Sequence, residues 1–260
     1  MPARFAFLGT SGALTSATRD NTSIVVQADD VAVLVDCGGS AVHRLRRLGI
    51  DPLRLTHVVV THVHVDHAYG LPSLVRQLGL LGRRAPLAVV CRPEHVDVLR
   101  ALLAVFRLWD KSDLFPVTLS PIDLEVGARA PARGSLIVRT APNEHGAMPN
   151  FAVRVEAGSR ALVYSSDTRP SQAVITLAGD AHTLVHEATF AERDRATARA
   201  VHHSSAADAG RVAAAAGAHR LILTHVGAEY HHDPGPLVDE ARAQFTGRVE
   251  MAEELRFYPL

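Results

Sequence analysis

The sequence has few lysines, cysteines and long apolar runs, and each shortage excludes a class of protein. Lys111 is the single lysine, and 27 basic residues balance 27 acidic ones, so no overall positive field attracts nucleic acid or anionic membrane. The two cysteines, Cys37 and Cys91, lie in apolar runs without metal-type spacing, which predicts buried free thiols. No apolar run fits a signal peptide or a membrane span, so we expect a cytoplasmic protein.

The rest of the composition is that of a globular protein with a substantial core. Of the 260 residues, 47% are hydrophobic and 21% are charged. This length favours one large domain over two, so we expect a single domain over residues 1–260. The sequence shows no linker or low-complexity segment that would divide it.

Strand and helix patterns follow one order twice along the chain, a run of strands and then alternating strands and helices. In the first half the patterns predict strands at 4–10, 22–28, 31–38, 56–62 and 86–92, and helices at 41–49, 70–82 and 93–106. In the second half they predict strands at 123–128, 136–142, 183–190 and 219–225, a hairpin at 151–167, and helices at 204–217 and 235–245. We therefore expect an α+β fold of four layers, αββα.

Four side chains that bind metals occur within six positions directly after a β-branched run. These are His62, His64, Asp66 and His67. The side chains at 62 and 64 point the same way after a strand, and the following turn directs 66 and 67 elsewhere. Imidazole and carboxylate groups are ligands for Zn²⁺ and similar ions, and two neighbouring ions suit hydrolysis. The pattern favours a metal site over a histidine-rich surface loop.

Three more candidate ligands lie at the ends of predicted strands. His145 follows "LIVRT", Asp167 ends the second strand of the hairpin, and His225 ends "HRLILTH". Each alone fits a structural role equally well, because a strand-terminal aspartate commonly caps a turn. Their shared placement favours all three as members of the same site.

The segment "THVHVDH" (61–67) resembles the HxHxDH signature of the metallo-β-lactamase superfamily. Within that superfamily the chain is most similar to the ribonuclease Z branch, over nearly its full length. The matching segments include "FLGTSGALTSATRDNTS" (7–23), "LVDCGG" (34–39), "SSDTRPS" (165–171), "HEATF" (186–190) and "HHSSAADAGRVAAAAGAHRLILTH" (202–225). The resemblance implies the αββα sandwich and two divalent metal ions. We expect Zn²⁺, with Mn²⁺ or iron as alternatives.

The resemblance also implies a role for each candidate residue. One ion would be held by His62, His64 and His145, the other by Asp66, His67 and His225, with Asp167 as the bridge. A metal-bridging hydroxide would attack phosphorus, and Asp66 would orient it or accept its proton. His203 would be the general acid, oriented by Glu187. His203 also precedes a predicted helix whose N-terminal N–H groups favour a phosphate, and Asp36 is expected to support the ligands.

One departure from the branch bears on the substrate. Members that process tRNA carry a Gly/Pro-rich arm before the bridging aspartate, whereas here a plain hairpin joins His145 to Asp167. We therefore expect a binuclear phosphodiesterase acting on small phosphodiesters or RNA 3′ ends, with a homodimer expected by analogy alone. The alternatives are a hydrolase of a sulfate ester, lactone or thioester on the same site, and a metal-containing redox protein. The redox alternative is disfavoured because the chain has no room for a flavin or diiron partner domain.

Overall fold

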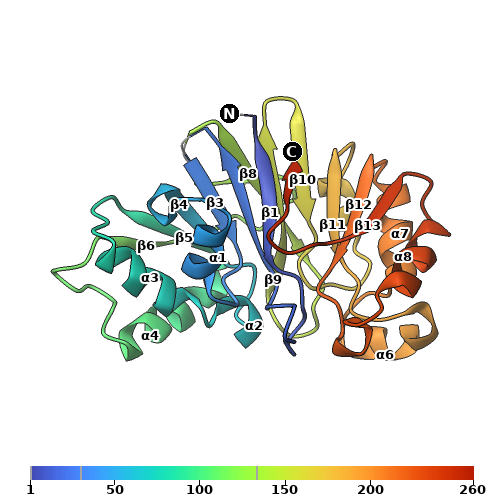
Figure 1. Ribbon diagram of the computed structural model, residues 1–260, viewed down its shortest axis with the longest axis horizontal. Helices are drawn as coiled ribbons and strands as arrows, with labels where there is room; N and C mark the ends of the chain where they lie inside the picture. Colours follow the sequence, from blue (N-terminus) through green and yellow to red (C-terminus); the bar gives the residue numbers. More distant parts are fainter. Residues whose placement is uncertain (1, 30, 133) are drawn as a thin grey trace.

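Two seven-stranded sheets pack face to face, and helices cover the outer side of each sheet (Figure 1). This computed structural model describes residues 2–29, 31–132 and 134–260. The expected α+β class and four-layer αββα arrangement are confirmed. Within the described residues, no helix has the length and apolar character that crossing a lipid bilayer requires. Both cysteines are buried and free, as predicted.

The first sheet contains the N-terminal half of the chain and its last strand. In spatial order its strands are β14 (Phe257–Pro259), β1 (Arg4–Gly9), β2 (Ser23–Ala28), β3 (Val31–Val35), β4 (Leu55–Val59), β5 (Leu87–Cys91) and β6 (Val117–Pro121). Neighbours are antiparallel from β14 to β3 and parallel from β3 to β6. Its outer face is covered by α1 (Ala41–Arg47), α3 (Leu71–Leu80) and α4 (Val96–Val105). The one-turn helix α2 (Val65–Ala68) follows the carboxyl end of β4.

The second sheet repeats this plan with the C-terminal half. In spatial order its strands are β13 (Arg248–Met251), β12 (Arg220–Thr224), β11 (Thr183–Glu187), β10 (Arg160–Tyr164), β9 (Asn150–Ala157), β8 (Leu136–Asn143) and β7 (Ala128–Ala130). Neighbours are parallel from β13 to β10 and antiparallel from β10 to β7. The helices of this half are α5 (Gln172–Leu177), α6 (Arg195–Ala200), α7 (Ala206–Ala215) and α8 (Gly235–Arg242). Short 3₁₀ turns lie at Pro52–Arg54, Pro93–His95, Glu192–Asp194 and Ala228–Tyr230.

Central strands carry apolar side chains on both faces because both faces of each sheet are buried. Along β2, Ile24 and Val26 pack between the two sheets, whereas Val25 packs under the helices. Along β12, Ile222 faces the other sheet and Leu221 lies under α7 and α8. Side chains of a strand alternate between its two faces, so a strand covered on both sides reads as one apolar run.

Several elements differ from the sequence prediction. The segment 123–128 alternates like a strand, but Leu124 and Val126 are exposed and strand β7 starts only at Ala128. The predicted helix at 93–106 begins with a 3₁₀ turn before α4. Strands β6, β13 and β14 and helices α5 and α6 were not predicted. They are short elements at sheet edges or on the surface. Tertiary packing stabilises them, so their local sequence patterns are weak.

Candidate metal centre

All seven predicted ligands follow strands at one edge of the two sheets, five of them on loops and two, Asp66 and His67, in the one-turn helix α2. From the first sheet, the segment after β4 carries His62, His64, Asp66 and His67. From the second, His145 lies between β8 and β9, Asp167 follows β10, and His225 follows β12. Parallel strands deliver their carboxyl ends to one edge, and here both sheets deliver them to a common point. The structure thus brings together every predicted ligand.

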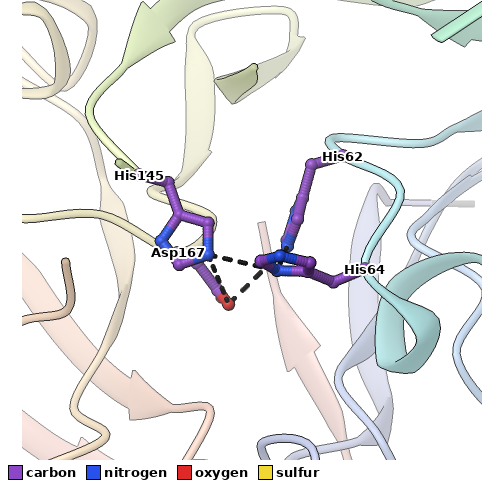
Figure 2. A group of neighbouring side chains, drawn as sticks. All are labelled: His62, His64, His145 and Asp167. Atoms are coloured by element: carbon purple, nitrogen blue, oxygen red, sulfur yellow. Dashed lines mark hydrogen bonds and ion pairs between the residues drawn. The ribbon is translucent and has the colours of Figure 1, made fainter. Parts of the chain in front are cut away.

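The first group of ligand atoms contains three histidines and one aspartate. His62, His64, His145 and Asp167 each offer an atom within 4.8 Å of the others. His64 Nδ1 lies 3.0 Å from His62 Nε2 and 3.2 Å from His145 Nε2. Figure 2 shows His62 and His64 converging from one side with His145 and Asp167 opposite them. Both halves of the chain therefore contribute to this group.

The second group contains Asp66, His67 and His225, again from both halves. His67 Nε2 lies 3.4 Å from His225 Nε2, and Asp66 Oδ2 lies 3.4 Å from each of these nitrogens. His67 is fully buried, and Asp66 borders a surface cavity. The group is therefore accessible on its Asp66 side.

Asp167 lies between the two groups. Its Oδ2 is 3.2 Å from His225 Nε2 and 3.4 Å from His67 Nε2 in the second group. In the first group the same oxygen is 3.8 Å from His62 Nε2 and 4.0 Å from His145 Nε2. One carboxylate oxygen thus faces nitrogens of both groups, which is the position that a ligand shared by two ions requires.

Hydrogen bonds to Nδ1 orient two of the histidines with Nε2 toward the centre. His67 Nδ1 donates to the Asp36 carboxylate at 2.8 Å, and His145 Nδ1 donates to the His202 carbonyl at 3.1 Å. When a metal ion keeps either ring neutral, its bond places the proton on Nδ1 and leaves the lone pair of Nε2 facing the other ligands. Lone pairs that face one another repel unless a cation lies between them.

The buried charges at the centre also fit divalent cations. Asp167 Oδ1 is buried and, within the part of the chain that is described, has no hydrogen-bond partner, although burying a carboxylate without one is costly. Burial holds the pKa of His62 well below its usual range, which keeps this imidazole in the neutral form that binds metals. Burial also lowers the pKa of His67, but Asp167 and Asp36 outweigh burial and raise it well above its usual range. These carboxylates thus attract positive charge, and the donor set fits divalent metal ions.

Asp36 supports the segment 61–67 through hydrogen bonds to Thr61 and His67, in the supporting position that the sequence led us to expect. Its carboxylate accepts the Thr61 N–H at 2.8 Å and the Thr61 hydroxyl at 3.0 Å, as well as the His67 ring nitrogen. Asp36 adopts a φ of +58°, which asparagine and aspartate tolerate better than most residues. Its fully buried side chain thereby fixes both ends of the segment that carries four ligands.

Asp36→Asn should weaken zinc binding by about 10- to 100-fold, the usual effect of losing a partner that orients a ligand. Asparagine keeps the backbone conformation but places an NH₂ group against either the Thr61 N–H or the His67 Nδ1–H. Titration with zinc against a chromogenic chelator measures the change. Asp180→Asn is the matched control, because Asp180 has a similar φ of +52° and is exposed on another loop. Unchanged zinc affinity in Asp36→Asn would contradict the role assigned to Asp36.

His203 and Glu187 form a pair at the rim of the ligand cluster. His203 Nδ1 lies 2.8 Å from Glu187 Oε1, and the Glu187 side chain is fully buried. Glu187 also accepts the Thr168 N–H at 2.7 Å, which fixes its carboxylate. Burial lowers the pKa of His203, but the Glu187 carboxylate outweighs burial and raises it to about 9. His203 also lines the adjoining cavity.

The helix after His203 does not offer the phosphate site that its sequence predicted. Ser205 caps α7 by accepting the Asp208 N–H at 3.1 Å, and the Asp208 carboxylate accepts the Ser205 N–H. The Ala206 N–H donates to the Phe190 carbonyl at 2.9 Å. These N–H groups are occupied and an aspartate already lies in the first turn, so the predicted phosphate role of this helix end is wrong.

The sequence did not reveal two supporting groups. Thr189 Oγ1 donates to Glu187 at 2.7 Å and lies 2.9 Å from His225 Nδ1, so it connects the rim pair to a candidate ligand. The backbone of His202, at a φ of +63°, supplies the carbonyl that orients His145. The signal in the sequence for Thr189 is its position two residues after Glu187, just beyond the end of β11. A carbonyl leaves no such signal.

Two hollows adjoin the ligand cluster and share His64, Val201 and His203 in their linings. The first hollow, of about 470 Å³, lies between the loops after β1, β11 and β12. Its lining is Gly12, Ala13, Leu14, His64, Val65, Asp66, Asp167, Thr189, Phe190, Val201, His203, His225, Val226, Gly227 and Ala228. The second hollow, of about 440 Å³, is lined by His64, His145, Gly146, Ala147, Met148, Val201, His202 and His203.

Comparisons with known proteins agree with this geometry. The family model described as "Beta-lactamase superfamily domain" matches residues 32–226. A ribonuclease Z of Halorubrum lacusprofundi is 32% identical, with 98% of this chain and 96% of the relative covered. That alignment spans 299 positions, so the relative holds residues that the 260-residue chain lacks.

Solved structures share the fold over the whole chain. The metallo-β-lactamase fold protein YhfI from Bacillus subtilis has a TM-score of 0.82 at 24% identity, and 99% of each chain is covered. The short form of human tRNase Z has a TM-score of 0.78 at 22% identity, with 98% of each chain covered. From the family match, the full-length relative and the shared fold, the chain belongs to the beta-lactamase superfamily and, within it, is similar to the ribonuclease Z proteins.

Proposed function

We propose that this protein is a binuclear metal-dependent phosphodiesterase whose two ions are held by the two ligand groups. The observation that carries the proposal is the position of Asp167 Oδ2, which faces imidazole nitrogens of both groups. The names of the relatives support phosphodiester chemistry, because a ribonuclease Z is among them and the human neighbour is a tRNase. Zinc is the proposed metal, with Mn²⁺ or iron as alternatives that the same ligands accept.

Bound ions would supply an activated water and compensate negative charge on the phosphate oxygens. The chain's own residues then divide the proton transfers. Asp66 lines the first hollow, and its carboxylate accepts a proton from the attacking water or orients it. His203 holds a proton at Nε2 for the leaving oxygen, while Glu187 binds Nδ1 and fixes the ring. Acid and base thus lie on different segments beside the same cluster.

The connection between the third and fourth ligand segments favours a small substrate. Strands β9 and β10 form a hairpin that turns at Gly158 and Ser159, with Arg160 paired to Ala157. The chain therefore has no protruding arm between His145 and Asp167 with which to hold the body of a tRNA. We propose small phosphodiesters or short RNA 3′ ends as substrates. A hydrolase of sulfate esters, lactones or thioesters on the same site is the second candidate, because metals and acid would serve it equally.

A panel of substrates separates these candidates. Zinc- or manganese-loaded protein should hydrolyse bis-p-nitrophenyl phosphate faster than p-nitrophenyl sulfate or p-nitrophenyl acetate, because the site pairs metal ligands with an acid for a phosphate oxygen. Precursor tRNA at the same salt concentration should give a lower kcat/KM than the small diester, since tight capture of RNA needs many cationic contacts. A faster sulfate or acetate reaction would contradict the phosphodiesterase proposal. Site-specific tRNA cleavage of higher kcat/KM would contradict the size argument.

A further inference from the structure

The mouth of the first hollow is apolar. Leu14 is 67% exposed, Val65 is 74% exposed and Val201 is 48% exposed. They come from three segments far apart in the sequence, the loop after β1, the start of α2 and the end of α6, yet all line the same hollow. Phe190 adds an aromatic ring to this lining. Single exposed apolar side chains need no explanation, but a group around a reactive centre marks a binding surface.

Apart from His203, whose pKa is raised to about 9, the described residues that line the two hollows offer a polyanion no strongly basic side chain. Among the described residues, neither lining includes lysine or arginine. Arg169 and Arg199 line a separate hollow with Glu144 and Pro170, and the Arg169 guanidinium donates to the Arg199 carbonyl at 2.7 and 3.0 Å. A substrate with further phosphates next to the scissile one would therefore lose hydration there without gaining ion pairs.

The arrangement of the hollows matches a phosphate with two substituents. They meet at His64, Val201 and His203, beside the ligand cluster, and extend from it along different loops. A phosphodiester held at the cluster would place one substituent in each hollow, whereas a monoester would leave one hollow empty. The first hollow, about 470 Å³, lies within the usual range of small-molecule sites.

We propose that, of the two substrate classes named above, the site takes the small phosphodiester in preference to an RNA 3′ end. This diester carries an uncharged apolar substituent, aryl or alkyl, that packs in the first hollow against Leu14, Val65, Phe190 and Val201. This inference rests on the proposed function, because it assumes that the ligand cluster binds the phosphate. Apolar contact with the substituent, instead of ion pairing along a phosphate backbone, distinguishes this site from a site for nucleic acid.

Equilibrium binding tests the inference without relying on turnover. Isothermal titration calorimetry of zinc-loaded protein compares diphenyl phosphate with dimethyl phosphate, two monoanions that differ in apolar area. Diphenyl phosphate should bind at least about 10-fold more tightly, with a more negative heat-capacity change, because a buried ring adds more than the free energy of a tenfold change in Kd. A 5′-phosphorylated thymidine dinucleotide, which carries extra charge, should bind more weakly than diphenyl phosphate.

Two leucine variants locate the effect. Leu14→Ala should weaken diphenyl phosphate binding by roughly threefold or more, because it removes apolar contact from the first hollow. Leu80→Ala is the matched control, since Leu80 is 68% exposed on α3 and outside both hollows, and it should bind like the wild type. Equal binding of the two phosphates, tighter binding of the dinucleotide, or no difference between the leucine variants would overturn the inference.

The same samples separate this inference from the proposed function. Hydrolysis of bis-p-nitrophenyl phosphate without any preference for diphenyl phosphate would contradict the apolar hollow alone. A clear preference for diphenyl phosphate without hydrolysis of any diester would contradict the phosphodiesterase alone. Absence of phosphate binding would contradict both.

Discussion

Asp167→Asn should leave the protein with less than one tightly bound metal ion and lower kcat/KM on bis-p-nitrophenyl phosphate by about three orders of magnitude. Asp167 Oδ2 faces nitrogens of both ligand groups, and Oδ1 is buried without a partner among the described residues. Asparagine has nearly the same size but no charge, so the backbone is kept while the shared ligand is lost. Elemental analysis by mass spectrometry and steady-state kinetics measure the two effects.

Asp66→Asn is the informative comparison for this variant. Asp66 Oδ2 contacts only nitrogens of the second group, His67 and His225, among the ion pairs of the described chain. The Asp66→Asn variant should therefore lose about one metal ion and keep the other. Far-ultraviolet circular dichroism controls for misfolding of either variant. Equal metal content in Asp167→Asn and wild type would contradict the shared position of Asp167 and, with it, the binuclear site.

His203→Ala should lower kcat by roughly 10²- to 10⁴-fold while the metal content stays unchanged. The ring contacts ligand histidines without belonging to the seven proposed ligands, and Glu187 holds its Nδ1 at 2.8 Å. A general acid matters most for a leaving oxygen of high pKa. The loss should therefore be smaller for p-nitrophenolate esters than for alkyl esters, and a leaving-group series on wild type and variant measures this.

Two further variants control the assignment of His203. His219→Ala replaces an exposed histidine that stacks on His182 and is not among the site residues. Its kcat and metal content should equal those of the wild type. Glu187→Gln keeps the side-chain shape and should reproduce part of the loss of kcat, since His203 loses its carboxylate partner. An equal loss for good and poor leaving groups would show that His203 binds substrate and donates no proton. A fall in metal content would place His203 among the ligands instead.

Much of the candidate site could be predicted from the sequence because its ligands share a simple rule of placement. His62, His145 and His225 all follow strands, and the carboxyl ends of strands that run in the same direction lie at one edge of a sheet whatever the loops do. The supporting contacts follow no such rule. The carbonyl that orients His145 belongs to His202, 57 positions away, and depends on a left-handed φ that the side chain does not encode.

The fold shows the same division. Apolar runs in β2 and β12 identify strands buried on both faces, whereas β14 has three residues and is defined by pairing with β1 from the other end of the chain. The predicted phosphate role of α7 failed for a related reason. Ser205 indicates a helix start, but the sequence does not tell whether Asp208 or a ligand satisfies the first N–H groups.

Each ligand group combines residues from both halves of the chain, and this affects the stability of the folded chain. His64 and His145 are 81 positions apart, and His67 and His225 are 158 positions apart, yet each pair belongs to one group. An ion held by either group is a cross-link that closes a long loop between the two halves. Its binding free energy is then also free energy of folding, in the way that a disulfide restricts the unfolded chain. Removal of such ions by a chelator should therefore lower the free energy of unfolding, as reduction of a disulfide does.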